Sequence, residues 1–347
     1  MKLGLSALMF GKRAEVNMDL ILLAEKLGFD STWTAEAYGN DAVTTATWIA
    51  AHTSTIKVGT AIMQMPARTP AMTAMTAMSL DHLSGGRFLV GLGPSGPQVV
   101  EGWHGVPYGK PLTRTKEYIK IMRMIFEREG PLEFHGSMYD IPNTGEGTTG
   151  FGKPLKSILH GNPKIPIYTA SISPAGIRCS AEVADGVFPM MLDPDKYDDV
   201  ILPYVNDGFA KAEGNKTLAD FDVAPAVSVV VSDDLDAARM LLKPNMALYI
   251  GGMGARGKNF YNDYVSRMGF EAEAVKIQDL YLGGKVPEAV AAVPDELVDA
   301  VHLVGTKGRI RERFSAWKAL GASGKIKTVI VGAMQPEALE VLAEEML

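Results

Sequence analysis

The sequence predicts an α/β fold of the (β/α)8 TIM barrel class, and two observations carry this prediction. Short apolar segments rich in β-branched residues alternate with longer segments in which apolar residues recur at helical spacing. The alternation repeats eight times, and successive strand–helix–strand units form right-handed crossovers in a parallel sheet that can close on itself. We therefore predict a single barrel domain over residues 1–347, with insertions after strand four, before strand five, and between strands seven and eight.

The individual elements are placed where apolar segments meet glycine, proline and polar residues. The predicted strands are Leu3–Leu8, Ser31–Ala35, Lys57–Met65, Phe88–Leu92, Ile167–Ser171, Gly186–Met190, Val223–Val231 and Thr328–Gly332. The predicted helices are Val16–Leu27, Thr44–His52, Ala71 to the stop at Gly85–Gly86, Thr113–Arg128, Pro174–Val183, Lys196–Glu213, Asp233–Leu242, Thr306–Leu320 and Pro336–Glu345. The predicted insertions are the irregular Pro97–Leu112, Gly130–Pro166 with a hairpin at Glu133–Ile141 and a mobile loop at Asn143–Gly152, and Lys243–Gly305 with several short helices.

Composition excludes several classes of protein. The apolar fraction of 47% and charged fraction of 21% are typical of a soluble globular protein, and the net charge of -6 gives no electrostatic basis for binding nucleic acid. The single cysteine, Cys179, allows no internal disulfide and no cysteine-rich metal site. No apolar segment reaches membrane-spanning length, and the N-terminal one is too short for a signal sequence. We therefore expect a cytoplasmic protein with no nucleic-acid or membrane partner.

The segment Gly91–Gly96 has the spacing G-x-G-x-x-G of a dinucleotide-binding loop. In that motif a helix opens directly at the third glycine, and an acidic residue follows the next strand. Pro94 and Pro97 argue against such a helix, and no suitable acidic residue follows, so we reject a Rossmann fold. Two interpretations remain. Either the backbone approaches a flat ring or a sugar closely, which we favour after a barrel strand, or the segment is a plain turn.

Two residues are candidates for proton transfer. Glu36 ends the second predicted strand, where barrel enzymes place catalytic groups, although a solvated carboxylate at the start of a loop explains it equally well. Trp103 and His104 follow strand four and offer a stacking surface and a group that titrates near neutral pH, unless the loop simply packs beneath its own aromatic residues. No metal-ligand spacing is present, so we predict no metal site.

The segment from Ser171 to Gly176 opens the helix after strand five. The hydroxyl groups of Ser171 and Ser173, together with the free N–H groups of a helix N-terminus, could bind a phosphate. Capping of the helix by Ser173 alone explains part of this pattern. Earlier in the chain, Met72, Met75 and Met78 recur at intervals of three residues and are predicted to fill the core.

Over almost its whole length the chain resembles the luciferase-like oxidoreductases, a superfamily of flavin- and deazaflavin-dependent (β/α)8 enzymes. The stretches that carry the resemblance are VGTAIMQMPARTPAMTAMTAMSLDHLSGGRFLVGLGPSGPQVVEGWHG and AEVADGVFPMM. They are similar to an actinobacterial subgroup that uses coenzyme F420 and, more distantly, to methylenetetrahydromethanopterin reductases. The resemblance implies a homodimer.

The resemblance also implies which residues bind the cofactor. They are Ala61, Ile62, Met63, Gly91, Gly93, Ser95, Gly96, Ser171 and Ser173. Ala61–Ile62 matches a cis peptide bond behind the deazaflavin ring, and Glu36 matches an acidic residue after strand two. Two departures are Ser6, where some reductases have a carboxylate, and Ala37, where some dehydrogenases have histidine.

The function implied is hydride transfer between F420 and a small organic substrate, with Glu36 or His104 handling the proton. The loop Thr144–Lys153 is expected to act as a lid. One alternative is an FMN-dependent monooxygenase on the same barrel, in which reduced FMN activates oxygen. The other alternative is a non-catalytic protein that binds flavin or deazaflavin.

Overall fold

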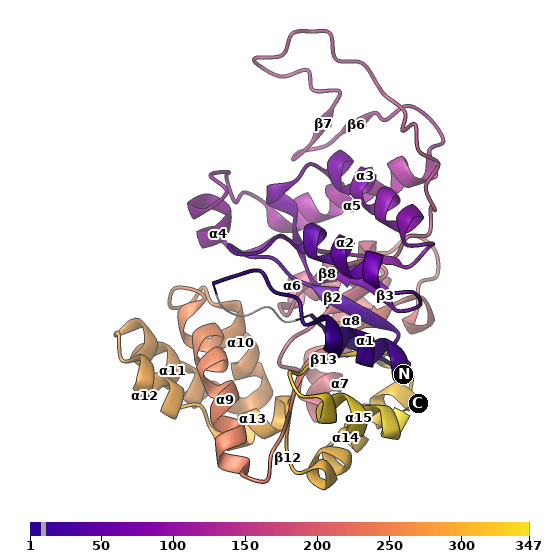
Figure 1. Ribbon diagram of the computed structural model, residues 1–347. Helices are drawn as coiled ribbons and strands as arrows, with labels where there is room; N and C mark the ends of the chain where they lie inside the picture. The colour runs from indigo at the N-terminus through magenta and orange to yellow at the C-terminus, as the bar shows by residue number, and fades with distance from the viewer. Residues whose placement is uncertain (8–11, 347) are drawn as a thin grey trace.

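A curled parallel sheet with helices on its outer face forms the centre of the computed structural model, which describes residues 1–7 and 12–346 (Figure 1). The strands of this sheet are β1 (Lys2–Ser6), β2 (Ser31–Thr34), β3 (Lys57–Thr60), β4 (Met63–Gln64), β5 (Phe88–Gly93), β8 (Ile167–Ala170), β9 (Gly186–Phe188), β10 (Asp222–Val223), β11 (Ala226–Val231), β12 (Leu303–Gly305) and β13 (Thr328–Gly332). They lie in the order β10-β9-β8-β5-β3-β2-β1-β13-β11-β12, and β4 pairs with β5.

The segment that contains β10 and β11 links the two sides of the curled sheet, since β10 lies at one end and β11 lies between β13 and the other end, β12. β10 pairs with β9 and β11 pairs with β13, while a bridge between Met190 and Ala226 links the first pairing to the second. The backbone N–H of Ala226 also donates to the carbonyl of Pro189 at 3.1 Å. The arrangement is therefore TIM-barrel-like, in agreement with the predicted α/β class.

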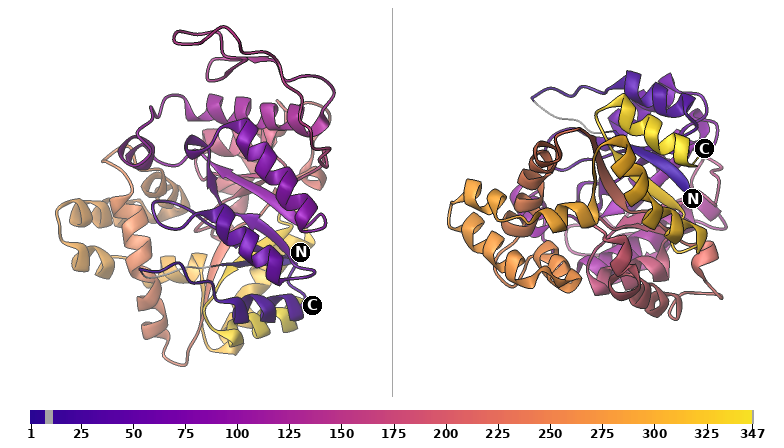
Figure 2. Two further views of the ribbon diagram at one scale, coloured as in Figure 1. Left: turned by 45° about the horizontal axis from the view of Figure 1, so that its top comes forward. Right: turned by 90° about the horizontal axis from the view of Figure 1, so that it is seen from below.

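Fifteen α-helices are described within residues 12–346. They are α1 (Met18–Lys26), α2 (Ala42–His52), α3 (Pro70–Leu83), α4 (Pro97–Gly102), α5 (Pro111–Glu127), α6 (Pro174–Val183), α7 (Tyr197–Val200), α8 (Leu202–Phe209), α9 (Leu235–Ala247), α10 (Phe260–Val265), α11 (Glu271–Leu282), α12 (Val286–Ala291), α13 (Asp295–Val301), α14 (Lys307–Ala322) and α15 (Pro336–Met346). None of these helices is long and apolar enough to cross a membrane. The helices α9 to α13 gather at one side of the sheet in both views of Figure 2.

Most predicted elements are confirmed, with ends that shift by a few residues. The predicted hairpin is present as β6 (Phe134–His135) and β7 (Asp140–Ile141), and it projects from the body of the molecule at the top of Figure 1. The first predicted strand ends at Ser6, and Leu8, its last predicted residue, lies outside the described residues.

Two predicted strands are interrupted. The segment predicted as strand three contains β3 and β4, separated by a cis peptide bond between Ala61 and Ile62. This bond confirms what the family resemblance implies at this position. The segment predicted as strand seven contains β10 and β11, which are separated at Pro225, because proline has no N–H for a sheet ladder.

The segment after β5 corrects one step of the sequence argument. Pro97–Leu112 was predicted to be irregular, but it begins with helix α4, which Gly96 precedes and in which Pro97 is the first residue. Proline fits the first helical position because the N–H that it lacks has no partner there. The Rossmann fold is excluded by the sheet instead, because its strands β1, β2, β3, β5, β8 and β9 neighbour one another in chain order without a reversal.

The segment Lys243–Gly305 holds a strand that was not predicted. β12 pairs with β11 in parallel, with Leu303 beside Val229 and Gly305 beside Val231. Three residues are too few to establish a strand period, and periodicity therefore missed it.

The concave face of the sheet encloses a small core of aromatic rings. The ring centroids of Trp33 and Phe188 lie 5.0 Å apart although β2 and β9 are not neighbours, and Tyr168 stacks on Phe188 at 5.0 Å. Glycine makes room for these rings, because a Cβ on Gly59 would lie 2.4 Å from the Trp33 ring and one on Gly91 would lie 2.8 Å from Phe188. The interior of the sheet is therefore filled by side chains.

The three methionines of α3 do not share one environment. Met78 is buried against the main core, but Met72 and Met75 are each 53% exposed. The prediction that all three fill the core is therefore wrong for two of them. Residues three apart lie on neighbouring positions of a helix, and here only the last faces the sheet.

Candidate functional site

The predicted site residues gather at the carboxyl edge of the sheet. Glu36 follows β2 and Ser171 follows β8, and Gln64, which was not predicted, ends β4. In a parallel sheet these strand ends lie at one edge, which is where barrel enzymes bind ligands. Gln64 also pairs with Gly93 at the end of β5, so the predicted glycine segment lies at the same edge.

Glu36 is a buried carboxylate whose two oxygens are both hydrogen-bonded. Its side chain is 7% exposed, so the interpretation as a solvated carboxylate is wrong. One oxygen accepts the backbone N–H of Gln64 at 2.8 Å and the other that of Ala42 at 3.0 Å. The guanidinium of Arg68 donates to the same two oxygens at 2.5 and 3.1 Å. Glu36 therefore joins β2, β4 and the start of α2.

Arg68 links Glu36 to a second carboxylate. It also donates to Asp41, which caps α2 by accepting the backbone N–H of Thr44 at 2.6 Å. Burial raises the pKa of Asp41, but the hydrogen bonds from Thr44 and the charge of Arg68 outweigh it and hold this pKa below its ordinary value. We call Glu36, Asp41, Gln64 and Arg68 the carboxylate cluster.

His104 contacts the carboxylate cluster through Gln64. Its Nε2 lies 3.2 Å from Oε1 of Gln64, and the Nε2 of that buried amide donates to the carbonyl of Ala37 at 2.5 Å. The neighbouring Trp103 is exposed, with its ring 6.5 Å from that of Tyr38, so Trp103 does not cover this loop. The structure thus connects Glu36 and His104, the two proton-transfer candidates.

The glycine segment is partly strand. Gly91 and Gly93 are buried in β5, and a Cβ on Gly93 would lie 2.7 Å from the side chain of Ile62. These glycines allow β5 to pack closely against the residues around the cis peptide bond. The connecting loop itself is short, with Ser95 at a φ of 59° and Gly96 before α4.

Ala61 and Ile62 are half-buried and pack against the inner aromatic core, while Met63 is buried and pairs with Leu92. The backbone at Ala61–Ile62 is therefore placed between that core and the carboxyl edge of the sheet.

The N-terminus of α6 brings two hydroxyl groups together. Ser173 caps the helix as predicted, because its Oγ accepts the backbone N–H of Gly176 at 3.1 Å. A Cβ on Gly176 would lie 1.9 Å from Oγ of Ser171 and 2.9 Å from that of Ser173, so both hydroxyls converge above this glycine. The combination is suited to an anion such as a phosphate.

Arg267 reaches the same place from the segment after α10. Its guanidinium donates to the carbonyl of Ile172 at 2.9 Å, and its Nε is buried with no hydrogen-bond partner among the described residues. A buried donor without a partner is costly, and the positive charge of this guanidinium favours an anion nearby. We call Ser171, Ser173 and Arg267 the hydroxyl cluster.

Sequence reasoning missed Gln64, Arg68 and Arg267. Their side chains act on residues 40, 32 and 95 positions away in the chain, and no local pattern reveals such contacts. Position at a strand end was an available signal for Gln64 alone.

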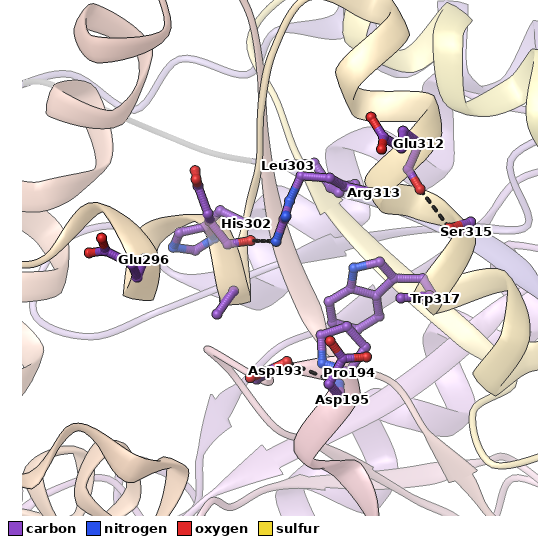
Figure 3. A pocket seen from close by; sticks show the side chains of 13 residues that line it. Asp193, Pro194, Asp195, Glu296, His302, Leu303, Glu312, Arg313, Ser315 and Trp317 are labelled. Atoms are coloured by element: carbon purple, nitrogen blue, oxygen red, sulfur yellow. Dashed lines mark hydrogen bonds between the residues drawn. The ribbon is translucent and has the colours of Figure 1, made fainter.

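A cavity of about 540 Å³ lies away from these residues, between α13, β12, α14 and the segment after β9 (Figure 3). Carboxylates such as Asp193, Glu296 and Glu312 line it, so it is unsuited to an anionic cofactor. Burial lowers the pKa of His302, beside this cavity, to about 4. Among the described residues, no group of three or more His, Cys, Asp or Glu side chains could hold a metal ion.

A curled parallel sheet with polar groups converging at its carboxyl edge defines the TIM-barrel-like class of proteins. The chain belongs to the luciferase-like family, because the model of luciferase-like monooxygenases matches residues 1–324. The family resemblance seen in the sequence is thereby confirmed.

Relatives and solved structures extend this result. A putative coenzyme F420-dependent oxidoreductase, Rv3520c, of Mycobacterium tuberculosis is 42% identical, over 94% of this chain and 95% of the relative. The 5,10-methylenetetrahydromethanopterin reductase of Archaeoglobus fulgidus is 26% identical, over 94% of this chain and 93% of the relative. The structure of the coenzyme F420-dependent tetrahydromethanopterin reductase from Methanopyrus kandleri superposes with a TM-score of 0.79 at 22% identity, over 99% of this chain and 97% of that one.

Two further structures have the same fold. An F420-dependent secondary alcohol dehydrogenase in complex with an F420-acetone adduct gives a TM-score of 0.72 at 18% identity, over 99% of this chain and 98% of that one. The oxygenating constituent of 3,6-diketocamphane monooxygenase from Pseudomonas putida, in complex with FMN, gives a TM-score of 0.64 at 19% sequence identity. This match covers 99% of this chain and 97% of that one.

Proposed function

We propose that this protein is an F420-dependent oxidoreductase that transfers a hydride between the deazaflavin and a small organic substrate. The observation that carries the proposal is the hydroxyl cluster, in which two hydroxyls, a helix N-terminus and the positive charge of Arg267 gather around Ser171–Gly176 and suit the phosphate of F420. The 42% identity to a putative coenzyme F420-dependent oxidoreductase supports the choice of cofactor. The structural similarity to the F420-dependent secondary alcohol dehydrogenase supports the fold only.

The proposed binding residues follow the carboxyl edge of the sheet. Backbone groups at Ala61, Ile62 and Met63 would support the deazaflavin ring, and the segment Gly91–Gly96 would lie beside the ring and the ribityl chain. The hydroxyl cluster would hold the phosphate. F420, when bound, supplies two-electron hydride chemistry, and the protein contributes position, water exclusion and a proton.

We assign the proton to His104. Glu36 was the other candidate, but its oxygens already accept hydrogen bonds from two backbone N–H groups and from Arg68. Because both of its oxygens already accept from protein donors, this carboxylate is placed to position other groups. His104 is half-buried at the same edge, and its Nδ1 makes no hydrogen bond to a described residue.

The architecture and assembly complete the proposal. Residues 1–347 would form one (β/α)8 barrel domain in the cytoplasm, with insertions after strand four, before strand five, and between strands seven and eight. The loop Thr144–Lys153 would act as its lid. A second copy of the chain would cover the apolar residues that α2 and α3 expose, which include Trp48, Met72 and Met75. Light scattering should then report a dimer, and replacement of Met72 and Met75 by glutamate should yield monomers.

The experiment that tests the function is a parallel titration with F420 and with FMN, followed by tryptophan fluorescence. Trp103 is exposed beside the proposed site and reports binding there. We expect a micromolar dissociation constant for F420, about −8 kcal/mol, and much weaker binding of FMN. Preference for FMN would instead indicate a monooxygenase. Tight F420 binding without reduction or oxidation of the cofactor in a substrate screen would indicate a non-catalytic protein.

A further inference from the structure

Gln64 is a buried amide in contact with one of the proposed reacting groups. It is 2% exposed at the end of β4, and its backbone is held by Glu36 on one side and by pairing with Gly93 on the other. A buried amide needs a hydrogen-bond acceptor for its nitrogen and a donor for its oxygen. The two partners of this side chain are the carbonyl oxygen of Ala37 and the ring of His104.

The hydrogen-bond roles of these partners follow from their chemistry. The carbonyl of Ala37 can only accept, so the NH₂ group of Gln64 must point toward it, at 2.5 Å. The opposite orientation would bring two oxygen acceptors together. The amide oxygen therefore faces His104, and because an amide oxygen can only accept, Nε2 of His104 must carry a hydrogen.

We propose that Gln64 is a positioning residue that holds His104 as the Nε2–H tautomer. Nδ1 is then the ring nitrogen that gains and loses the proton during turnover, and this consequence rests on the proposed function. In the same scheme, the carboxylate cluster serves to orient His104. Arg68 holds Glu36, Glu36 holds the backbone of Gln64, and the side chain of Gln64 orients the imidazole.

The other histidines provide references for testing the tautomer. Nδ1 of His52 lies 2.7 Å from the carbonyl of Trp48, so His52 must be the Nδ1–H tautomer. Nε2 of His82 lies 3.1 Å from the carbonyl of His160, so His82 must be the Nε2–H tautomer. Both forms are therefore present in one spectrum.

The test is NMR of protein labelled with ¹⁵N at histidine, recorded without cofactor. We expect an Nε2–H correlation that His104→Ala abolishes and that thereby belongs to His104. Gln64→Met removes the acceptor, so this proton should exchange with water and its signal should disappear. Gln64→Glu keeps an acceptor facing Nε2 and, as the neutral acid, can still donate to the carbonyl of Ala37, so it should retain the signal. An Nδ1–H form of His104, or a signal unchanged in Gln64→Met, overturns the proposal.

A matched control and a second measurement separate the possible failures. Gln335 is an amide bonded to Val231 at two points, so Gln335→Met repeats the substitution elsewhere and should leave the His104 signal unchanged. The His52 and His82 signals report whether each variant is folded. F420 titration of the same samples tests the proposed function separately, because absence of F420 binding would refute that function and leave the tautomer assignment standing.

Discussion

The carboxylate cluster and the hydroxyl cluster lie at the same edge of the sheet, but their polar groups are satisfied in different ways. Glu36 has protein donors on both oxygens, and Arg68 spans two carboxylates. In the hydroxyl cluster, Arg267 keeps a buried Nε without a partner among the described residues. The polar groups of the first cluster are therefore satisfied within the protein, whereas the second keeps an unpaired donor among the described residues.

This difference predicts how substitutions will behave. Interactions completed within the protein contribute to the free energy of unfolding of the protein alone. Donors that are left open contribute mainly when the ligand binds, through the affinity. Substitutions in the two clusters should therefore separate stability from binding.

The largest expected effect breaks the carboxylate cluster. Arg68→Met leaves the buried carboxylate of Glu36 without its cation and should lower the free energy of unfolding by about 3–5 kcal/mol. Urea denaturation without cofactor measures this loss. Arg178 pairs with Asp207 at the surface, so Arg178→Met should cost less than about 1 kcal/mol. Equal losses in the two variants would show that the cluster is not stabilising.

The second-largest expected effect is a loss of stability at acid pH, which comes from His302 and involves neither cluster. Burial lowers the pKa of His302 from 6.5 to about 4, so the unfolded chain binds a proton that the folded chain does not. Stability should be unaffected above pH 6.5 and should fall by about 3 kcal/mol as the pH drops from 6.5 to 4.

His302→Asn should remove this loss, because asparagine can still accept the N–H of Ser228 but does not titrate. Denaturation curves at a series of pH values measure the difference. If His302→Asn loses as much stability at acid pH as the unchanged protein, the loss comes from other groups, such as the carboxylates.

The next effect tests the hydroxyl cluster. Arg267→Met should weaken F420 binding by about 10- to 100-fold, because a charge-assisted hydrogen bond to the phosphate is lost. It should change the stability of the cofactor-free protein far less than Arg68→Met does. Arg256, from the same part of the chain, pairs with Asp279 at the surface, and Arg256→Met should leave F420 affinity unchanged. Fluorescence titration distinguishes the two variants.

The smallest expected effect distinguishes the two serines of the hydroxyl cluster by their contributions to stability. Ser173→Ala should lower stability by about 1 kcal/mol, because the cap of α6 is lost. Ser171→Ala should not, since its hydroxyl makes no hydrogen bond to another described residue. Both substitutions should weaken F420 binding severalfold. A loss of stability in Ser171→Ala would show that its hydroxyl also supports the fold.

The fold class was predictable because its signal is local and repeated. The helix Pro174–Val183 and the strand Thr328–Gly332 are found with the predicted ends, since capping residues and β-branched runs mark them. The interruption at Pro225 and the helix at Pro97 were missed because proline has opposite effects in a strand and at a helix start.

The candidate site was predictable only where chemistry coincides with a strand or helix end. Glu36 and Ser173 were found in this way, and Ser173 caps its helix as expected. The environment of Glu36 was not predictable, because its cation, Arg68, is 32 positions away and is brought close by the curl of the sheet. Whether a carboxylate is solvated or buried depends on such distant contacts.

The aromatic rings on the concave face also limit where a substrate can go. Trp33, Tyr168 and Phe188 fill the space that the sheet encloses, and strand glycines allow them to pack closely. Among the described residues these rings occupy the middle of the sheet, so we expect a ligand to reach Ala61 and Ile62 from the carboxyl edge. A bulkier substrate must extend outward among the insertions, and we expect a change of substrate preference to come from replacing residues there while the strands stay as they are.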